Sequence, residues 1–242
     1  MPAKPPRPNF IAHLTWADVE RRLARGAAAL LPVGAAAKEH GLHLPMNTDE
    51  IQAGWLSANL AERHDLLIWP ALTYGHYPAF TQFPGSISLS RPLFTKLVVE
   101  IVTGIAAWKP KAIFILDTGI STIAPVDDAL GGETWHLRPV HLRIHQGADY
   151  QAQADLLRQQ EFGSHADELE TSRMLAIAPR SVEMAKAAAT PSGPFQGALT
   201  RANAPSGSYG DPTLATRQKG EYLIKAMLAD LDRAVEQALT GS

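Results

Sequence analysis

The stretch KEHGLHLPMNTDE, residues 38–50, gathers side chains that can bind a metal ion or move a proton. His40 and His43 carry imidazoles, and Glu39 and Asp49 carry carboxylates, directly after an apolar run. Imidazole and carboxylate together suit borderline divalent ions, and a bound ion brings the pKa of a water molecule into the neutral range. The stretch therefore predicts a metal site with hydrolytic chemistry.

A structural interpretation of the same residues stays open. Asp49 is also placed to cap the helix that a periodic pattern predicts for 50–61, and His43 is placed to brace the loop beside Pro45. His40 and Asp49 are nine positions apart, which is too far for one face of a helix. They meet only if the loop between them folds back.

Composition limits the class of protein. The chain has 242 residues, 45% hydrophobic and 19% charged, and this predicts a single domain over 1–242 with a sizeable core. The absence of Cys leaves His, carboxylate, amide and water as metal ligands and suits a cytoplasmic location. A net charge of −2 gives no reason to expect nucleic acid or an anionic membrane as partner.

The sequence also bears on targeting and membrane segments. Residues 1–10, MPAKPPRPNF, are rich in proline and lack the apolar core of a signal peptide, which predicts a flexible leader. The sequence contains no apolar run of about 18 residues, so we expect no membrane span.

Apolar runs alternate with amphipathic stretches along the chain. The runs 27–33, 65–72 and 111–116 predict buried strands, and 140–145 predicts a strand with alternating faces. Helical spacing predicts a helix ending at Gly26 and further helices over 50–61, 90–108, 165–179 and around 223–235. The predicted fold class is therefore α/β, a three-layer sandwich with a mostly parallel central sheet flanked by helices. Two loops are of interest in such a fold. Ligands bind at the carboxyl ends of the parallel strands, where the 38–50 loop begins. The loop 188–212 is expected to pack on the surface or against a neighbour.

Four segments in order resemble motifs of the creatininase (creatinine amidohydrolase) family. They are LPVGAAAKEHGLHLPMNTD (31–49), YGHYPAFTQFPGSISLS (74–90), GSHADELETSRMLAIAP (163–179) and SGSYGDPTLATRQKGE (206–221). The resemblance runs from about residue 28 to 235. It implies a creatininase-like sandwich, two divalent ions at the sheet edge, hydrolysis of a cyclic or small amide, and a homo-oligomer that is often a hexamer.

The resemblance also implies roles for single residues. His40 corresponds to a metal-binding histidine and Asp49 to a carboxylate that bridges the ions. His165 corresponds to a histidine that opens its helix and moves a proton or binds substrate, and Glu170 lies in the matched Glu-Thr-Ser. We expect His165 and Glu170 to be catalytic and the ion to be Zn²⁺ or Mn²⁺.

The first departure from the family pattern is at Lys38, where the family has a glutamate two positions before the metal histidine. Here Glu39 is adjacent to His40, after an apparent insertion among the alanines 35–37. A bulge at the strand end would aim Glu39 inward. Because a lysine beside a metal ion is repulsive, we expect Lys38 to point outward and Glu39 to be the ligand.

The second departure removes a ligand. The family's Asn-Gly-His motif reads LDTGISTIAP (116–125) here, with Ile120 at the histidine position and Thr122 at a nearby acidic one. Ile cannot ligate, so either another residue replaces the bond or one ion is lost. Asp117, at the end of a predicted strand, is the ligand that we expect, although it can equally stabilise a turn.

Other candidates have weaker support. His76, His165 and Glu170 are further replacements for the missing ligand, and His76 also suits an ordinary loop packed among aromatic residues. His141, Arg143 and His145 share one face of the predicted strand, a pattern typical of a solvated or subunit-facing edge.

The sequence predicts a metal-dependent hydrolase with Glu39, His40, Asp49 and Asp117 around one or two ions and a small amide as substrate. The alternative is a family member that kept the fold and lost catalysis, because Ile120 stands where a ligand is expected.

Overall fold

The central sheet of this computed structural model, which describes residues 9–190, 193 and 199–241, has four parallel strands. The strands are β1 (Ala28–Val33), β2 (Leu66–Ile68), β3 (Ile113–Asp117) and β4 (Val140–Arg143), in the order β2-β1-β3-β4. The sheet confirms the predicted parallel arrangement. Leu31 of β1 pairs with Ile115 of β3, and Ile115 pairs in turn with His141 of β4.

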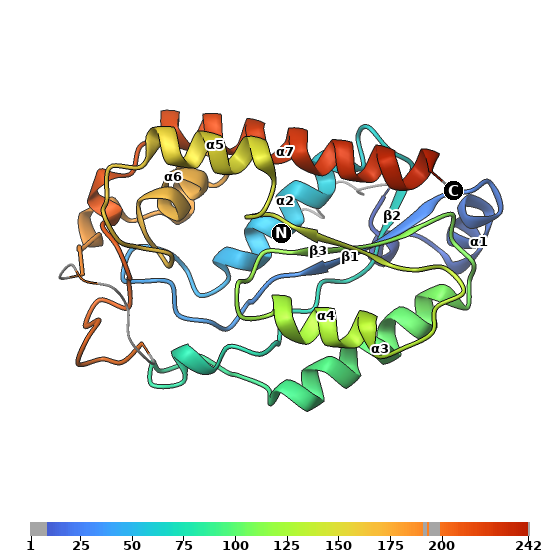
Figure 1. Cartoon of the computed structure of the whole chain (residues 1–242), viewed down its shortest axis with the longest axis horizontal. Helices are drawn as coiled ribbons and strands as arrows, with labels where there is room; N and C mark the ends of the chain where they lie inside the picture. The colour runs from blue at the N-terminus through green and yellow to red at the C-terminus, as the bar shows by residue number, and fades with distance from the viewer. Residues whose placement is uncertain (1–8, 191–192, 194–198, 242) are drawn as a thin grey trace.

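Helices cover both faces of the sheet (Figure 1). One face packs against α2 (Thr48–Leu60), α5 (Ala148–Leu157) and α7 (Arg217–Thr240), and the other against α3 (Arg91–Ala106) and α4 (Ile123–Gly131). The remaining α-helices are α1 (Trp16–Ala24) and α6 (Glu168–Ile177). Short 3₁₀ turns occupy Ile11–His13, Pro78–Phe80, Pro179–Ser181, Met184–Lys186 and Pro212–Leu214.

The buried strands explain the two cores. Successive side chains of a strand point to opposite faces, so Leu30 and Phe114 enter one core, whereas Leu31 and Ile115 enter the other. Every residue of β1 is buried, as expected for a parallel strand covered on both sides. These runs confirm the sandwich and fix the edge at which β1 and β3 end side by side.

Several predicted boundaries change. The run 65–72 forms a strand only up to Ile68, shortly before Pro70, which has no N–H to donate. The strand predicted over 140–145 ends at Arg143, and the chain then turns. Ser90 occupies the N-cap of α3 as expected, but its side chain makes no capping hydrogen bond.

The helix predicted over 165–179 begins only at Glu168. The Asp167 side chain caps it by accepting a hydrogen bond from the Glu170 N–H at 2.9 Å, and Ala166 has a φ of +46°, outside helical geometry. His165 therefore does not open the helix. It forms an isolated antiparallel bridge with Tyr209 instead.

The expected N-terminal leader and the expected 188–212 loop are described only in part. Residues 1–8 of the expected leader lie outside the described residues, and so do 191–192 and 194–198 of the expected 188–212 loop. Asn9 and Phe10 contact the sheet, because the Ile68 N–H donates to the Asn9 carbonyl at 2.7 Å. Among the described residues, no helix combines the length and the apolar character that crossing a bilayer requires.

Candidate metal centre

The candidate site lies at the carboxyl ends of β1 and β3. The chain leaves β1 at Gly34, loops through residues 35–47 and enters α2 at Thr48. A Cβ on Gly34 would lie 2.6 Å from the backbone oxygen of Asp49, so only glycine lets the end of the strand approach the first turn of α2 this closely. The loop therefore folds back as its chemistry requires.

Lys38 and Asp49 form a buried ion pair in this loop. Lys38 Nζ lies 2.7 Å from Asp49 Oδ2, and the two residues are 6% and 1% exposed. The expectation that Lys38 points outward is thus wrong, because the buried carboxylate of Asp49 needs a cation and the ammonium group supplies it.

Asp49 also faces His40. His40 Nε2 lies 3.2 Å from Asp49 Oδ1. Burial alone would raise the pKa of the Asp49 carboxyl, but the ammonium group of Lys38, together with a smaller interaction with His40, outweighs burial and holds that pKa well below its usual range. Asn47 occupies the N-cap of α2, and Asp49 lies inside its first turn. The capping role considered for Asp49 is therefore wrong, and its carboxylate faces Lys38 and His40 instead.

Glu39 turns toward the second half of the chain. Its Oε2 lies 3.0 Å from His165 Nε2, and its Oε1 accepts a hydrogen bond from the Gly41 N–H. Gly207 lies directly against this carboxylate, where a Cβ would overlap Glu39, and its φ of +82° also favours glycine. Glu39 is thus inward and buried, as predicted, but it contacts the imidazole of His165 rather than the Lys38–Asp49 pair.

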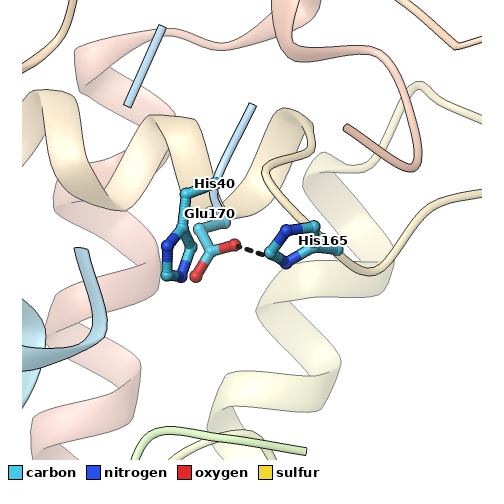
Figure 2. A group of neighbouring side chains, drawn as sticks. All are labelled: His40, His165 and Glu170. Atoms are coloured by element: carbon cyan, nitrogen blue, oxygen red, sulfur yellow. Dashed lines mark ion pairs between the residues drawn. The ribbon is translucent and has the colours of Figure 1, made fainter. Parts of the chain in front are cut away.

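Three side chains meet closely enough to share one ion (Figure 2). One ligand atom each from His40, His165 and Glu170 lies within 4.8 Å of the other two, and all three residues are buried. His165 Nδ1 lies 3.9 Å from Glu170 Oε2, and the rings of His40 and His165 are 5.1 Å apart. Two imidazoles and one carboxylate are a donor set that suits Zn²⁺ or Mn²⁺.

Hydrogen bonds orient both imidazoles. His40 Nδ1 lies 2.9 Å from the Lys38 carbonyl, which can only accept, so the proton is on Nδ1 and the lone pair is on Nε2. In the same way the carboxylate of Glu39 holds a proton on His165 Nε2 and leaves Nδ1 facing Glu170. A buried Nε2 of His40 without a hydrogen-bond partner, among the described residues, fits a metal ligand.

Glu170 is held and ionised by its neighbours. Its Oε2 accepts from the Ala166 N–H at 2.8 Å and its Oε1 from Gln52 Nε2 at 3.0 Å, with Arg173 3.7 Å away. Burial alone would raise the pKa of Glu170, but its interactions with His40, Arg173 and His165 outweigh burial and lower the pKa to about 2. A carboxylate that stays ionised is a better ligand than a proton carrier near neutral pH.

Asp117 lies at the predicted edge but bonds elsewhere. Its Oδ1 accepts from Thr122 Oγ1 at 2.6 Å and from the Gly119 N–H at 2.9 Å, and its Oδ2 lies 3.2 Å from His141 Nε2. Asp117 is not in the group of three around His40, and its role as a ligand stays a prediction. Ile120, which stands at the missing histidine, is 58% exposed.

Four of the other histidines have four different sets of partners. His76 Nδ1 lies 2.9 Å from the Leu89 carbonyl, away from the group of three, and His43 Nε2 lies 2.7 Å from Thr171 Oγ1, where it braces the loop. His141 and His145, which were predicted to share one face of a strand, have different partners. His141 lies in β4 and contacts Asp127 at 2.9 Å, whereas His145 lies beyond the end of β4 and faces the Thr118 carbonyl at 3.0 Å.

A cavity of about 370 Å³ opens beside the site. Its lining includes residues from the loops after β3 and β4. It also includes Arg173 of α6 and the site residues Lys38, Asp49, His165 and Glu170. Pockets of about 300–1,000 Å³ are usual for small-molecule ligands. The charged groups are therefore placed where a small substrate can reach them.

Sequence reasoning missed residues that only the folded chain brings in. Gln52, Tyr150 and Arg173 form a buried chain of hydrogen bonds behind Glu170, with Arg173 Nε 2.9 Å from Gln52 Oε1 and Arg173 NH1 2.7 Å from the Tyr150 hydroxyl. Their helical spacing gave no signal of it. The loop 188–212 was expected to pack on the surface or against a neighbour, but its residues Gly207 and Tyr209 contact Glu39 and His165.

Comparison with known proteins defines the class. The family model described as "Creatinine amidohydrolase" matches residues 12–235, so the chain belongs to the creatininase family. A creatinine amidohydrolase from Pseudomonas putida is 27% identical, over 94% of this chain and 96% of its own length. A mycofactocin precursor peptide peptidase from Mycolicibacterium smegmatis is 26% identical, over 82% of this chain and 80% of its own.

A solved structure described as "Creatininase Mn" superimposes with a TM-score of 0.83 at 25% identity, covering 96% of this chain and 99% of the other. The resemblance expected from the four motifs, and the three-layer α/β sandwich expected with it, are both confirmed.

Proposed function

We propose that the chain is a metal-dependent hydrolase that cleaves the C–N bond of a small or cyclic amide. The observation that carries the proposal is the buried group of His40, His165 and Glu170, in which hydrogen bonds orient the two imidazoles and His165 and Glu170 line the cavity. Relatives named as an amidohydrolase and as a peptidase both act on C–N bonds, which supports this reaction class.

The side chains have distinct tasks in this proposal. His40 Nε2, His165 Nδ1 and a Glu170 carboxylate oxygen would hold one Zn²⁺ or Mn²⁺ ion. Such an ion, when bound, supplies a Lewis acid for the amide carbonyl and lowers the pKa of water. Glu39 keeps the proton on His165 Nε2, and the Lys38 carbonyl keeps the proton on His40 Nδ1.

The expected catalytic roles of His165 and Glu170 thus become metal binding. Glu170 has a pKa of about 2, far from neutral, and a general acid works best when its pKa is near the operating pH. The Glu39–His165 contact at 3.0 Å is a carboxylate–imidazole pair behind the ion, of the kind that raises the basicity of a ligand.

The test compares His40→Ala with His76→Ala. We expect the wild-type protein to hold about one divalent ion per chain by elemental analysis. We also expect it to open the rings of a panel of small cyclic amides, which gives a free amino group and a carboxylate on the same product. His40→Ala should lose the ion and lower activity more than about a hundredfold, whereas His76→Ala, outside the group, should change neither. An unchanged metal content in His40→Ala would refute the ligand assignment.

A second candidate is a binding protein that lost catalysis. Two observations support this candidate. Ile120 stands where a metal ligand is expected, and Lys38 forms an ion pair with the carboxylate of Asp49. A wild-type protein that holds no ion after dialysis against Zn²⁺ and Mn²⁺, and cleaves no amide, would favour this candidate. The homo-oligomer and the cytoplasmic location stay predictions.

A further inference from the structure

The carboxylate of Asp49 lies next to the candidate ligands but outside their group. Asp49 is 1% exposed in the first turn of α2, with Oδ1 toward His40 and Oδ2 toward Lys38. The group of three around the candidate ion does not include it. A carboxylate buried this deeply needs a positive partner, which is either a protein cation or a metal ion.

Lys38 is held in place as that partner. Its ammonium lies 2.7 Å from Asp49 Oδ2 and 5.0 Å from the centroid of the Phe80 ring, with the Tyr77 ring 5.5 Å away. Both rings present apolar surface and a favourable face to a cation. The backbone of Lys38 is fixed too, because its N–H donates to the Met46 carbonyl at 3.3 Å and its carbonyl faces His40 Nδ1.

We propose that Lys38 is a built-in cation that takes the place of a second metal ion at Asp49, so that the site holds one divalent ion and not two. The ammonium group covers Asp49 Oδ2, and its positive charge repels a dication from the same carboxylate. The position of the one ion, at His40, His165 and Glu170, rests on the proposed function. The exclusion of an ion from Asp49 does not.

Lys38 thereby performs two tasks with one residue. Its carbonyl fixes the tautomer of His40, and its side chain neutralises Asp49. It also lines the cavity, so its ammonium is a positive group that a substrate entering the cavity meets beside the metal centre. We therefore class Lys38 as a positioning residue that also sets the number of ions.

The experiment changes the sign of this charge. Lys38→Glu would place a second carboxylate beside Asp49, and Lys225→Glu makes the same change on the exposed side of α7. Equilibrium dialysis against Zn²⁺ and against Mn²⁺, followed by elemental analysis, gives the ions bound per chain. We expect one ion in the wild-type protein and in Lys225→Glu, and two ions in Lys38→Glu.

Two results would overturn the inference. One is a wild-type protein that binds two ions per chain with Lys38 intact. The other is a Lys38→Glu variant that folds, by circular dichroism, and binds no more ions than the wild type. If Lys38→Glu does not fold, Lys38→Met keeps the length of the side chain without its charge. We then expect at least tenfold tighter binding of Zn²⁺ in a chelator competition, and unchanged affinity would refute the role.

The outcomes separate this inference from the proposed function. A wild-type protein without an ion, together with a Lys38→Glu variant that gains one, would end the hydrolase proposal and support the built-in cation. A wild-type protein that binds one ion and cleaves amides, with a Lys38→Glu variant that also binds one, would support the hydrolase and end the built-in cation.

Discussion

Asp117, at the edge of the sheet, has either a structural role or a role as a metal ligand. Two variants of Asp117 distinguish these roles. The residue is 1% exposed and accepts hydrogen bonds from Thr122 Oγ1 and the Gly119 N–H, while its second oxygen faces His141 Nε2. Asp117→Asn keeps the shape and one oxygen. It removes the charge that strengthens these contacts and places an amide nitrogen toward one of the donors.

The magnitude follows from the three contacts. A hydrogen bond to a charged group contributes about 1.5–3 kcal/mol and a neutral one about 1 kcal/mol, so Asp117→Asn should lower the free energy of unfolding by about 1–3 kcal/mol. Asp117→Ala leaves the Thr122 hydroxyl, the Gly119 N–H and His141 without their acceptor. Each buried donor left unpaired costs about 1–3 kcal/mol, so we expect a loss of about 3–5 kcal/mol after relaxation.

The assay is urea unfolding followed by circular dichroism, together with the metal content of each purified variant. If Asp117 is structural, Asp117→Asn keeps the wild-type number of ions and loses stability. If Asp117→Asn instead loses its ion while its unfolding free energy stays within about 0.5 kcal/mol of the wild type, the charge served the metal and the structural reasoning is refuted.

Two further predictions test the interior of the fold. Burial lowers the pKa of His43 and His145 to about 4, with Arg173 adding to the effect at His145, so the folded chain takes up protons less readily than the unfolded one. The contribution of the two neutral histidines to the free energy of unfolding is therefore fully present above the unfolded pKa of 6.5. It falls as the pH drops toward 4, by up to about 3 kcal/mol per histidine. Urea unfolding at about pH 7, 6 and 5 measures this change, and an unfolding free energy that does not vary with pH would contradict it. Gly220→Ala should lower the unfolding free energy by about 2–4 kcal/mol, because its Cβ would overlap the backbone oxygen of Ser172 where α6 crosses α7. Gly104→Ala, on an exposed part of α3 with open space around it, should raise the unfolding free energy by about 0.5–1 kcal/mol, and equal effects in the two variants would refute the close packing.

The sheet and its two cores could be predicted because the strands carry their own signal. The runs around β1 and β3 are short, apolar and bounded by charge or glycine, and their covered faces follow from the alternation of side chains. The rule that parallel strands deliver polar residues to one edge also placed Asp117 and the 38–50 loop correctly.

The contacts within the site could not be predicted in the same way. Lys38 was expected outside because a lysine repels a metal ion, whereas in the folded chain the lysine is itself the cationic partner of Asp49. The place of His165 depends on the bridge to Tyr209 and on the Asp167 cap, and no helical pattern shows either of them. Long-range pairing decides such details, and local periodicity carries no information about it.

The meeting of Glu39 with His165 joins parts of the chain that are 126 positions apart. An ion held by the adjacent His40 and by His165 would act as a clasp between the first loop of the sheet and the turn that leads into α6. Such a clasp forms only when both parts are folded against each other, so its binding energy adds to the stability of the native state. An ion bound there would therefore be retained only by a chain in which these two distant parts are assembled.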